Sequence, residues 1–323
     1  MNFHRRKFLH LAMSTAVLPT LSETALALDY PTRPLHIVVG FPSGQADIVP
    51  RVLGQQLSDH LRQPVVIDSR PGAGTNIGTK IAVNASPDGY TLLLVTAANA
   101  INASLYNDPT FNFIRDIAPV AIIGHAPFVM VVNPALPART IPEFIAYAKA
   151  NPHKINMAFP GVGTLGHVLD EMFKMMTGTD LVMVPYSSSN WYPDLLSGQV
   201  QAAIVAVAPS IGSIKAGKLR ALGVTTATSV EALPDVPPIG QFVPGFEGGG
   251  WQGIGAPRNT PTEIVDKLNK EINAVVADPT MKTRLVELGI VPVSGTPAQF
   301  GKFIADETEK WSKVVKFAGI KPM

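Results

Sequence analysis

Residues 155–174 of the chain read INMAFPGVGTLGHVLDEMFK, a stretch that predicts an apolar strand, a glycine loop and an amphipathic helix in succession. Gly161, Gly163 and Gly166 allow the backbone to come close to a ligand. Thr164 can cap the helix, and the N–H groups of its first turn carry the positive end of the helix dipole. A carboxylate or a phosphate would fit such a site, and a plain strand-to-helix turn is the alternative interpretation.

The same alternation of apolar strands and amphipathic helices continues on both sides of this stretch. Continuous apolar runs predict strands at residues 35–41, 64–69, 91–97, 129–133, 155–159, 181–186, 202–207 and 221–226. Helical spacing of apolar residues predicts helices at residues 48–61, 75–84, 141–150, 166–177, 261–276 and 297–318. Such alternation favours parallel sheets covered on both faces, so we expect two α/β lobes with a cleft between them.

Two loop segments interrupt this pattern. A second glycine loop at residues 70–74 precedes the helix at 75–84, and Thr75 or Asn76 is the expected cap of that helix. Residues 233–250 are rich in glycine and proline and have almost no periodicity, so we interpret them as a crossing or linker segment.

The composition is that of a well-packed protein with a lightly charged surface. The chain has 323 residues, of which 46% are hydrophobic and 15% charged, and its length suffices for two domains of ordinary size. It has no basic stripe for nucleic acid, so we exclude nucleic-acid binding. It has no cysteine, which excludes metal sites built on thiolates and a lipid-anchored cysteine.

The first 27 residues, MNFHRRKFLHLAMSTAVLPTLSETALA, predict an export signal cleaved near Ala27. The segment at 5–9 is similar to a twin-arginine signal, and the general secretory route is the alternative. A membrane anchor is disfavoured because the apolar run is shorter than the ~20 residues of a spanning helix. Cleavage would leave 23 basic and 23 acidic residues, so the mature chain is formally neutral.

Two motifs in the chain are similar to known cofactor-binding or catalytic signatures. The glycines at 161, 163 and 166 match the dinucleotide fingerprint, but the strand that follows has no acidic residue at its end. Residues 208–212 are weakly similar to a nucleophile elbow, yet every histidine precedes Ser210, which is the wrong chain order for a hydrolase. An ordinary helix start explains residues 208–212 better.

The titratable residues beside the glycine loops leave their roles open. His167, in the first turn of its helix, is either a ligand contact or a packing residue. Asp47 and the pair Asp170 and Glu171 lie near helix starts, where they can act as dipole partners or as catalysts. No acid–base pair and no metal-ligand spacing is apparent, so we predict neither an enzyme nor a cofactor nor a metal site.

Eight short motifs, taken in order along the chain, identify a family that this chain resembles. They are YPTRP (30–34), FPSG with Asp47 (41–47), RPGAGTNIG (70–78), PDGYTLL (87–93), GVGT with His167 (161–167), VPY (184–186), KAGKLRA (215–221) and LPDVP (233–237). The ordered set resembles the tripartite tricarboxylate transporter substrate-binding proteins, also called Bug receptors, and the likeness covers nearly all of the mature sequence.

The resemblance implies a two-lobed periplasmic binding protein of the type II, Venus-flytrap class, with two parallel-rich sheets. Residues 28–128 and 251–323 would form the first lobe and residues 129–250 the second, with hinge crossings near 128–131 and 248–253. Such a receptor is a periplasmic monomer that closes on a small organic carboxylate and delivers it to integral membrane permease subunits. The ligand-binding residues that the resemblance implies are Phe41, Ser43, Gly44, Asp47, Ala97, Gly161, Gly163, Thr164, His167, Tyr186 and Val205.

Three departures from the family pattern concern the ligand. Gln45 and Ala46 fill a gap where two glycines are usual, residues 187–192 read SSSNWY instead of carrying lysine and glycine, and Val205 replaces an aspartate. These changes predict a less polar pocket, suited to an aromatic or medium-chain carboxylate. The alternative is that Trp191 and Tyr192 start a helix and pack against the lobe.

Two other functions remain open on the sequence alone. A receptor of the same fold can present its ligand to a sensor kinase without transporting anything, and an exported enzyme is the alternative from another functional class. The sequence does not distinguish transport from signalling.

Overall fold

The structure is a computed structural model that describes residues 30–43, 47–106, 110–186 and 190–321. The chain divides into Met1–Tyr30 and one compact unit, Pro31–Met323. The predicted export signal at residues 1–27 lies outside the described residues. Within the described part, no helix is both long and apolar enough to cross a membrane.

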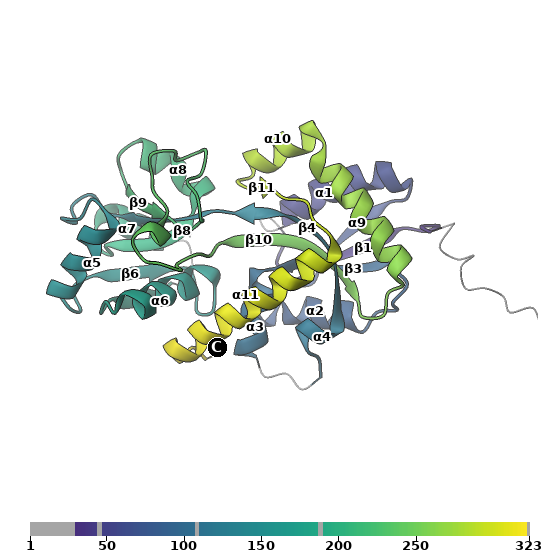
Figure 1. The fold of residues 1–323 in the computed structure, drawn as a ribbon, viewed down its shortest axis with the longest axis horizontal. Coiled ribbons are helices and arrows are strands. Elements are labelled where there is room, and N and C mark those ends of the chain that lie inside the picture. Colours follow the sequence, from purple (N-terminus) through teal and green to yellow (C-terminus); the bar gives the residue numbers. More distant parts are fainter. Residues whose placement is uncertain (1–29, 44–46, 107–109, 187–189, 322–323) are drawn as a thin grey trace, which may run out of the picture. The chain divides into compact units, whose positions relative to one another are not determined.

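The first lobe is built on a six-stranded sheet with the strand order β11-β4-β10-β3-β1-β2 (Figure 1). Its strands are β1 (Leu35–Val39), β2 (Val65–Ser69), β3 (Thr91–Thr96), β4 (Ile117–Ala126), β10 (Gly250–Pro257) and β11 (Val291–Pro292). Its helices are α1 (Ile48–Leu61), α2 (Asn76–Val83), α3 (Ala97–Leu105), α4 (Phe113–Asp116), α9 (Thr262–Ala277), α10 (Pro279–Glu287) and α11 (Pro297–Ala318).

The second lobe is built on a five-stranded sheet with the strand order β7-β6-β8-β5-β9. Its strands are β5 (Phe128–Val132), β6 (Asn156–Phe159), β7 (Val182–Pro185), β8 (Ala202–Ala206) and β9 (Arg220–Val224). Its helices are α5 (Ile141–Ala150), α6 (Leu165–Thr177), α7 (Trp191–Ser197) and α8 (Val207–Lys215). The chain passes from the first sheet to the second at Pro127 and returns along residues 225–249.

The helices with strong apolar periodicity form where the sequence predicts them. α1, α5 and α11 begin and end at the predicted residues, and the helix start expected at residues 208–212 is part of α8. The parallel-sheet prediction is correct for β1 with β2 and β3, and for β6 with β7 and β8. It is wrong elsewhere, because β10 pairs antiparallel with β3 and β4, and β5 pairs antiparallel with β8 and β9.

The elements that the sequence did not predict are irregular in composition. β4 contains Pro119 and Gly124, and β10 reads GWQGIGAP, a pattern that resembles a loop. The glycines of β10 are required by close packing: a Cβ added at Gly253 would lie 2.6 Å from the carbonyl oxygen of Ala121 and would also meet the Phe300 ring. Helices α3, α4 and α10 and the two-residue strand β11 were also missed.

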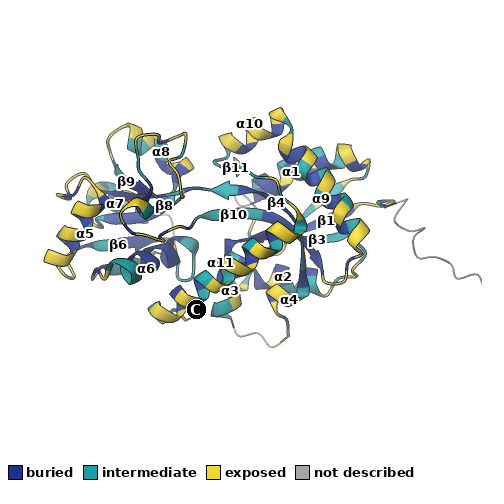
Figure 2. Cartoon of the chain, in the orientation of Figure 1, coloured by how far each residue is buried: buried dark blue, intermediate teal, exposed yellow. Residues whose placement is uncertain are grey.

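The central strands of both sheets are mostly buried, whereas β2 and β7 are partly exposed and the long helices expose one face (Figure 2). One core cluster contains side chains from both lobes, including Leu93 and Ile101 of the first and Phe144 and Phe173 of the second. The lobes therefore share part of their hydrophobic core, which positions the loops that project from each sheet.

The predicted cap of α2 is correct in position but makes no capping hydrogen bond. Thr75 stands at the N-cap position, but its φ is 90° and its side chain makes no capping hydrogen bond. Instead the Thr75 hydroxyl accepts a hydrogen bond from Asn99 Nδ2 at 3.2 Å, which links the second glycine loop to α3.

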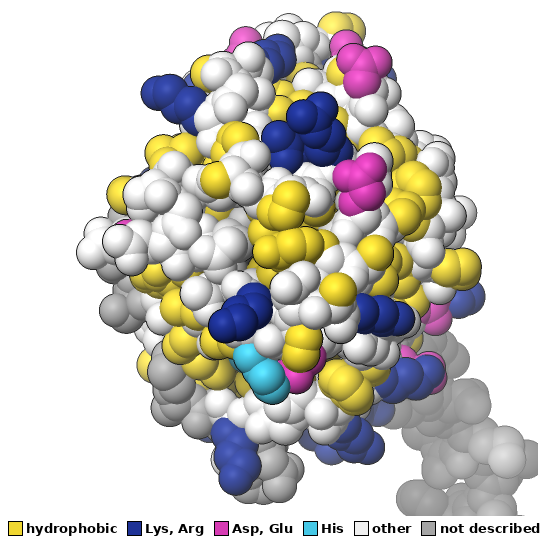
Figure 3. All heavy atoms as spheres, turned by 90° about the vertical axis from the view of Figure 1, so that its left-hand side faces the viewer, with side chains coloured by type: hydrophobic (Ala, Val, Ile, Leu, Met, Phe, Trp, Pro, Cys, Tyr) yellow, Lys and Arg dark blue, Asp and Glu magenta, His cyan; other side chains and the backbone are white. Residues whose placement is uncertain are grey.

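The end of the second lobe drawn in Figure 3 carries Lys and Arg side chains interspersed with acidic and hydrophobic ones. No stripe of a single sign crosses this face among the described residues.

We expect Gly253→Ala to destabilise the protein by about 1–3 kcal/mol, because the added methyl group would have to displace backbone on β4. The matched control is Gly212→Ala in α8, where a Cβ would have no neighbour within 4 Å. That change should be neutral or stabilising by up to about 1 kcal/mol. Urea unfolding of both variants checks the prediction, which equal stabilities would contradict.

Candidate functional site

The parallel strands bring the predicted ligand residues to one edge of each sheet. In the first lobe, Phe41 and Ser43 follow β1 and Ala97 follows β3, which is parallel to β1. In the second lobe, the loop at 160–167 follows β6 and Tyr186 follows β7. The carboxyl ends of parallel strands are where open α/β sheets bind ligands.

The glycine loop of the second lobe has a left-handed backbone at two positions. Gly161 has a φ of 113° and Gly163 a φ of 76°, which side chains other than glycine rarely adopt. The Thr164 hydroxyl donates to the Gly161 carbonyl at 2.8 Å and accepts from the His167 N–H at 3.5 Å. The predicted Thr164 cap is therefore confirmed.

The first two residues of α6, Leu165 and Gly166, have N–H groups with no acceptor in a preceding helical turn. The third, His167, is satisfied by Thr164. Because the hydroxyl of Thr164 already donates within the loop, the free donors here belong to the backbone. This arrangement suits an anionic oxygen at the positive end of the α6 dipole.

His167 holds the glycine loop through its ring. Its Nδ1 accepts a hydrogen bond from the Gly163 N–H at 3.1 Å, and its ring stacks on Phe159 with centroids 4.0 Å apart and planes 9° apart. Burial, and secondarily the charge of Lys174, lowers the pKa of His167 to about 4. The ring is therefore neutral at pH 7, with its lone pair on Nδ1, and acts on the loop geometry.

The acidic residues of α6 are bound to the protein itself. Asp170 is fully buried, its Oδ1 accepts from the Ile204 N–H at 3.2 Å, and burial raises the pKa of its carboxyl. Glu171 lies between His167 Nε2, 4.0 Å away, and Lys174 Nζ, 3.4 Å away. Asp170 fixes α6 to β8, whereas Glu171 pairs within α6, and neither side chain is assembled as an acid–base pair.

The predicted residues of the first lobe differ in exposure. Phe41 is half-buried, Ser43 exposed and Ala97 buried, whereas Gly44 lies outside the described residues. The Asp47 side chain is buried at the start of α1, and its Oδ2 accepts from Arg51 Nε at 2.9 Å and Nη2 at 2.7 Å. Arg51 thus neutralises the Asp47 carboxylate, which fits the interpretation of Asp47 as a helix-terminal group.

Tyr186 and Val205 are both engaged inside the second lobe. The Tyr186 hydroxyl donates to Asp194 Oδ2 at 2.7 Å, and this hydrogen bond is the main cause that raises the pKa of Tyr186 to about 12. Val205, 5% exposed, packs in the core cluster that also contains Val129 and Leu195. The phenol proton of Tyr186 is therefore committed to Asp194.

Trp191 and Tyr192 start helix α7 and pack against the same core cluster. Their rings meet edge to face with centroids 5.3 Å apart, and the Tyr192 hydroxyl donates to Ser213 Oγ at 2.7 Å. The structure thus matches the packing alternative, and these rings supply no support for an aromatic ligand. The neighbouring residues 187–189 lie outside the described residues.

The sequence did not predict a role for Leu105, which lies at the end of α3 in the first lobe. A Cβ added at Gly163 would lie 2.7 Å from Leu105 Cδ1, so this side chain contacts the glycine loop across the two lobes. No sequence signal identified Leu105, because α3 itself was not predicted. The contact shows that the end of α3 lies against the glycine loop of the second lobe.

Several cavities lie away from these loops. A groove of about 650 Å³ runs between α1 and α10, and a polar cavity of about 100 Å³ lies beside α2 and α3. Neither is lined by a predicted ligand residue, so we do not assign the ligand site to either of them.

A sequence profile described as the tripartite tricarboxylate transporter family receptor matches residues 49–320. The chain belongs to this family. Among its relatives, BugT of Bordetella pertussis is 36% identical over 297 residues, which cover 90% of this chain and 91% of that protein. The resemblance to Bug receptors is thereby confirmed.

Solved structures of this receptor family share the fold. R. palustris Rpa4515 with adipate is 35% identical, with a TM-score of 0.77 over 91% of this chain and 100% of that one. MatC from Rhodopseudomonas palustris with bound malate is 26% identical, with a TM-score of 0.73 over 88% and 100%. The predicted class, a two-lobed α/β periplasmic binding protein, is confirmed, and the family is one of solute-binding receptors.

We expect the stability of the protein to fall as pH decreases from 6.5 towards 4, in part because of His167. Its folded pKa, about 4, lies below its ordinary value of 6.5, so in this window the unfolded chain binds the proton and the folded chain does not. The contribution is present in full above pH 6.5, and at most about 3 kcal/mol is lost at low pH.

The comparison of wild type with His167→Gln isolates this contribution. Glutamine can still accept from the Gly163 N–H but does not titrate, so the variant should lose less stability between these pH values. Asp170, whose raised pKa contributes with the opposite sign, is common to both proteins and cancels. Identical pH profiles in denaturant titrations would show that His167 does not carry the effect.

We expect Gly163→Val to abolish ligand binding, because φ is positive there and the new side chain would push Leu105 away. Gly178→Val is the matched control: its φ of 63° gives similar backbone strain, but a Cβ there has no neighbour within 4 Å. Calorimetry should show binding by the control alone. If Gly163→Val binds like wild type and only its melting temperature falls, the loop is not the site.

Proposed function

We propose that this protein is a periplasmic receptor that captures a small organic carboxylate by closure of its lobes and delivers it to a tripartite tricarboxylate-type permease. The observation that carries the proposal is the start of α6, where Leu165 and Gly166 offer free N–H groups beside a loop that Leu105 of the first lobe contacts. Family membership and the adipate and malate in the related structures support it.

Binding and closure are one event in this proposal. A micromolar complex needs about 8 kcal/mol, and each charge-assisted hydrogen bond contributes about 1.5–3 kcal/mol. Donors from both lobes must therefore converge on the ligand. The lobes rotate about the crossings at Pro127 and at Gly248–Gly249. These crossings differ slightly from the predicted ranges 128–131 and 248–253, because β5 already begins at Phe128 and β10 at Gly250.

The proposed ligand contacts are those of the two sheet edges. Phe41, Ser43 and Ala97 contribute from the first lobe and the backbone of residues 161–166 from the second, while His167 positions the loop. Tyr186, Asp47 and Val205 shape the surroundings, since their polar groups are paired or absent.

Catalysis is not part of the proposal. Asp47 is paired with Arg51 and Tyr186 with Asp194, so these groups are not poised to exchange protons with a ligand. The protein is exported, loses its signal near Ala27 and acts as a monomer. Presentation of the ligand to a sensor kinase is the alternative role, and neighbouring genes for a sensor kinase instead of two permease subunits would favour it.

We expect adipate to bind more tightly than citrate. The resemblance implies that Val205 stands where the family usually has an aspartate, so a ligand with an apolar middle is preferred over a polyhydroxylated or highly charged one. A ligand at 100 times its Kd adds about 2.7 kcal/mol to the stability of the folded state. Thermal shift with a panel of organic acids, followed by calorimetry, checks the ranking.

Small-angle scattering with the best acid tests closure in the same samples. Compaction on saturation is expected, and a bound protein with unchanged dimensions would contradict the closure mechanism. If no acid in the panel raises the melting temperature, the carboxylate-receptor proposal itself fails. Tighter binding of citrate would overturn only the assignment of the ligand.

A further inference from the structure

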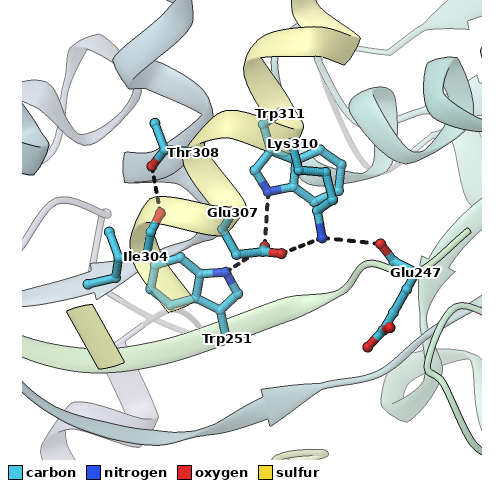
Figure 4. Close-up of polar contacts among 7 residues, drawn as sticks. All are labelled: Glu247, Trp251, Ile304, Glu307, Thr308, Lys310 and Trp311. Atoms are coloured by element: carbon cyan, nitrogen blue, oxygen red, sulfur yellow. Dashed lines mark hydrogen bonds and ion pairs between the residues drawn. The ribbon is translucent and has the colours of Figure 1, made fainter. Parts of the chain in front are cut away.

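A buried carboxylate on α11 connects two tryptophans at the boundary of the lobes. Glu307 is 7% exposed, and its Oε2 accepts from Trp251 Nε1 at 3.0 Å and from Trp311 Nε1 at 3.1 Å (Figure 4). Its Oε1 accepts from Lys310 Nζ. Every oxygen of this buried charge is therefore satisfied by a donor.

Helix α11 is hydrogen-bonded to the chain on both sides of the point where it re-enters the first lobe. Trp251 belongs to β10, immediately after the crossing. Lys310 also donates to the carbonyl oxygen of Glu247, at 3.1 Å, and lies 4.5 Å from the centroid of the Trp311 ring. We call Glu307, Trp251, Lys310 and Trp311 the hinge clamp.

The crossing segment is packed between α11 and the helix that starts the ligand site. A Cβ added at Gly248 would lie 2.8 Å from Leu169 Cδ2 on α6 and 2.9 Å from the Trp311 ring on α11. Only a glycine lets the chain pass between these two helices at this distance. Any rotation of the second lobe about this segment must therefore move α6 relative to the Trp311 ring.

Helix α11 spans the two lobes. It packs against α3 and β4 of the first lobe and against α6 of the second. The end of α3 carries Leu105, which contacts the glycine loop in this same conformation. The hinge clamp and the Leu105 contact are thus formed together.

We propose that Glu307 is a positioning residue for ligand capture, which holds the hinge through Trp251 and Lys310 and so sets the population of the conformer in which Leu105 contacts the glycine loop. The inference rests on the proposed function for its consequence, since the apparent Kd of a two-state receptor depends on the population of its binding-competent conformer. The hinge geometry itself can be tested without a ligand.

The test measures the distance between the lobes in the ligand-free protein. The chain has no cysteine, so Lys149→Cys on α5 and Lys270→Cys on α9, both exposed, can carry a pair of spin labels. Glu307→Gln removes the charge and replaces the oxygen that accepts from Lys310 with an amide NH2, which cannot accept a hydrogen bond. Loss of even one hydrogen bond shifts a two-state equilibrium roughly fivefold, so the distribution of label distances should broaden or move.

Glu309→Gln is the matched control, because Glu309 lies on the same helix and pairs with Lys313 through side chains that are 71% and 70% exposed. The control should give the wild-type distribution. Trp251→Phe, which removes one indole donor and retains an aromatic ring, should change the distribution in the same direction as Glu307→Gln. It also keeps the proposal testable if Glu307→Gln does not fold.

Unchanged distances in Glu307→Gln and Trp251→Phe, whether or not their melting temperatures fall, would overturn the proposal and leave the clamp a purely structural contact. With adipate as the probe, the variants should also bind several-fold more weakly than Glu309→Gln. If adipate binds none of these proteins, wild type included, the proposed function is called into question, while the distance measurement still decides the role of the clamp.

Discussion

The hydrogen bond from the Gly163 N–H to His167 Nδ1 is the interaction on which the candidate site depends. It joins the glycine loop to the first turn of α6, where Thr164 satisfies the His167 N–H in return. The left-handed backbone at Gly163 has no stabilisation of its own, so this bond and the stacking on Phe159 keep the loop in place. The N–H groups of Leu165 and Gly166, the first two of α6, follow directly after this loop.

The acidic side chains near the candidate site are paired within the protein. Asp47, Asp194 and Glu171 each have a partner within the protein, in Arg51, Tyr186 and Lys174. In the proposed function, the attraction for a carboxylate comes from backbone dipoles, which cannot be titrated. A site built this way can bind and release a ligand without changing the protonation of its side chains.

Helix α11 contacts both lobes, through α3 and β4 of the first and α6 of the second. Its buried Glu307 would be costly in an apolar boundary without donors, and the two indoles with Lys310 supply them. Such a network requires several residues to be in place at once. It therefore specifies one arrangement of the crossing segment more sharply than apolar packing alone does.

The amino-acid sequence by itself determined the regular elements with local signals. The apolar spacing defined α1, α5 and α11 to the residue, and the threonine before α6 identified its cap, because these patterns depend on neighbours within one or two turns. The ordered motifs also identified the family. Local patterns of this kind were sufficient for the fold class and for one half of the candidate site.

Only the tertiary structure decided the features that depend on residues far apart in the chain. The glycine pattern of β10 is typical of a loop, and only the close approach of Ala121 and Phe300 explains it. Thr75 is a typical N-cap residue, and only the structure shows that its hydroxyl accepts a hydrogen bond from Asn99. Leu105 on the glycine loop and Glu307 between two tryptophans likewise have no local signature. Each role is set by a long-range contact, and the energy of such a contact is not encoded in the periodicity of either segment.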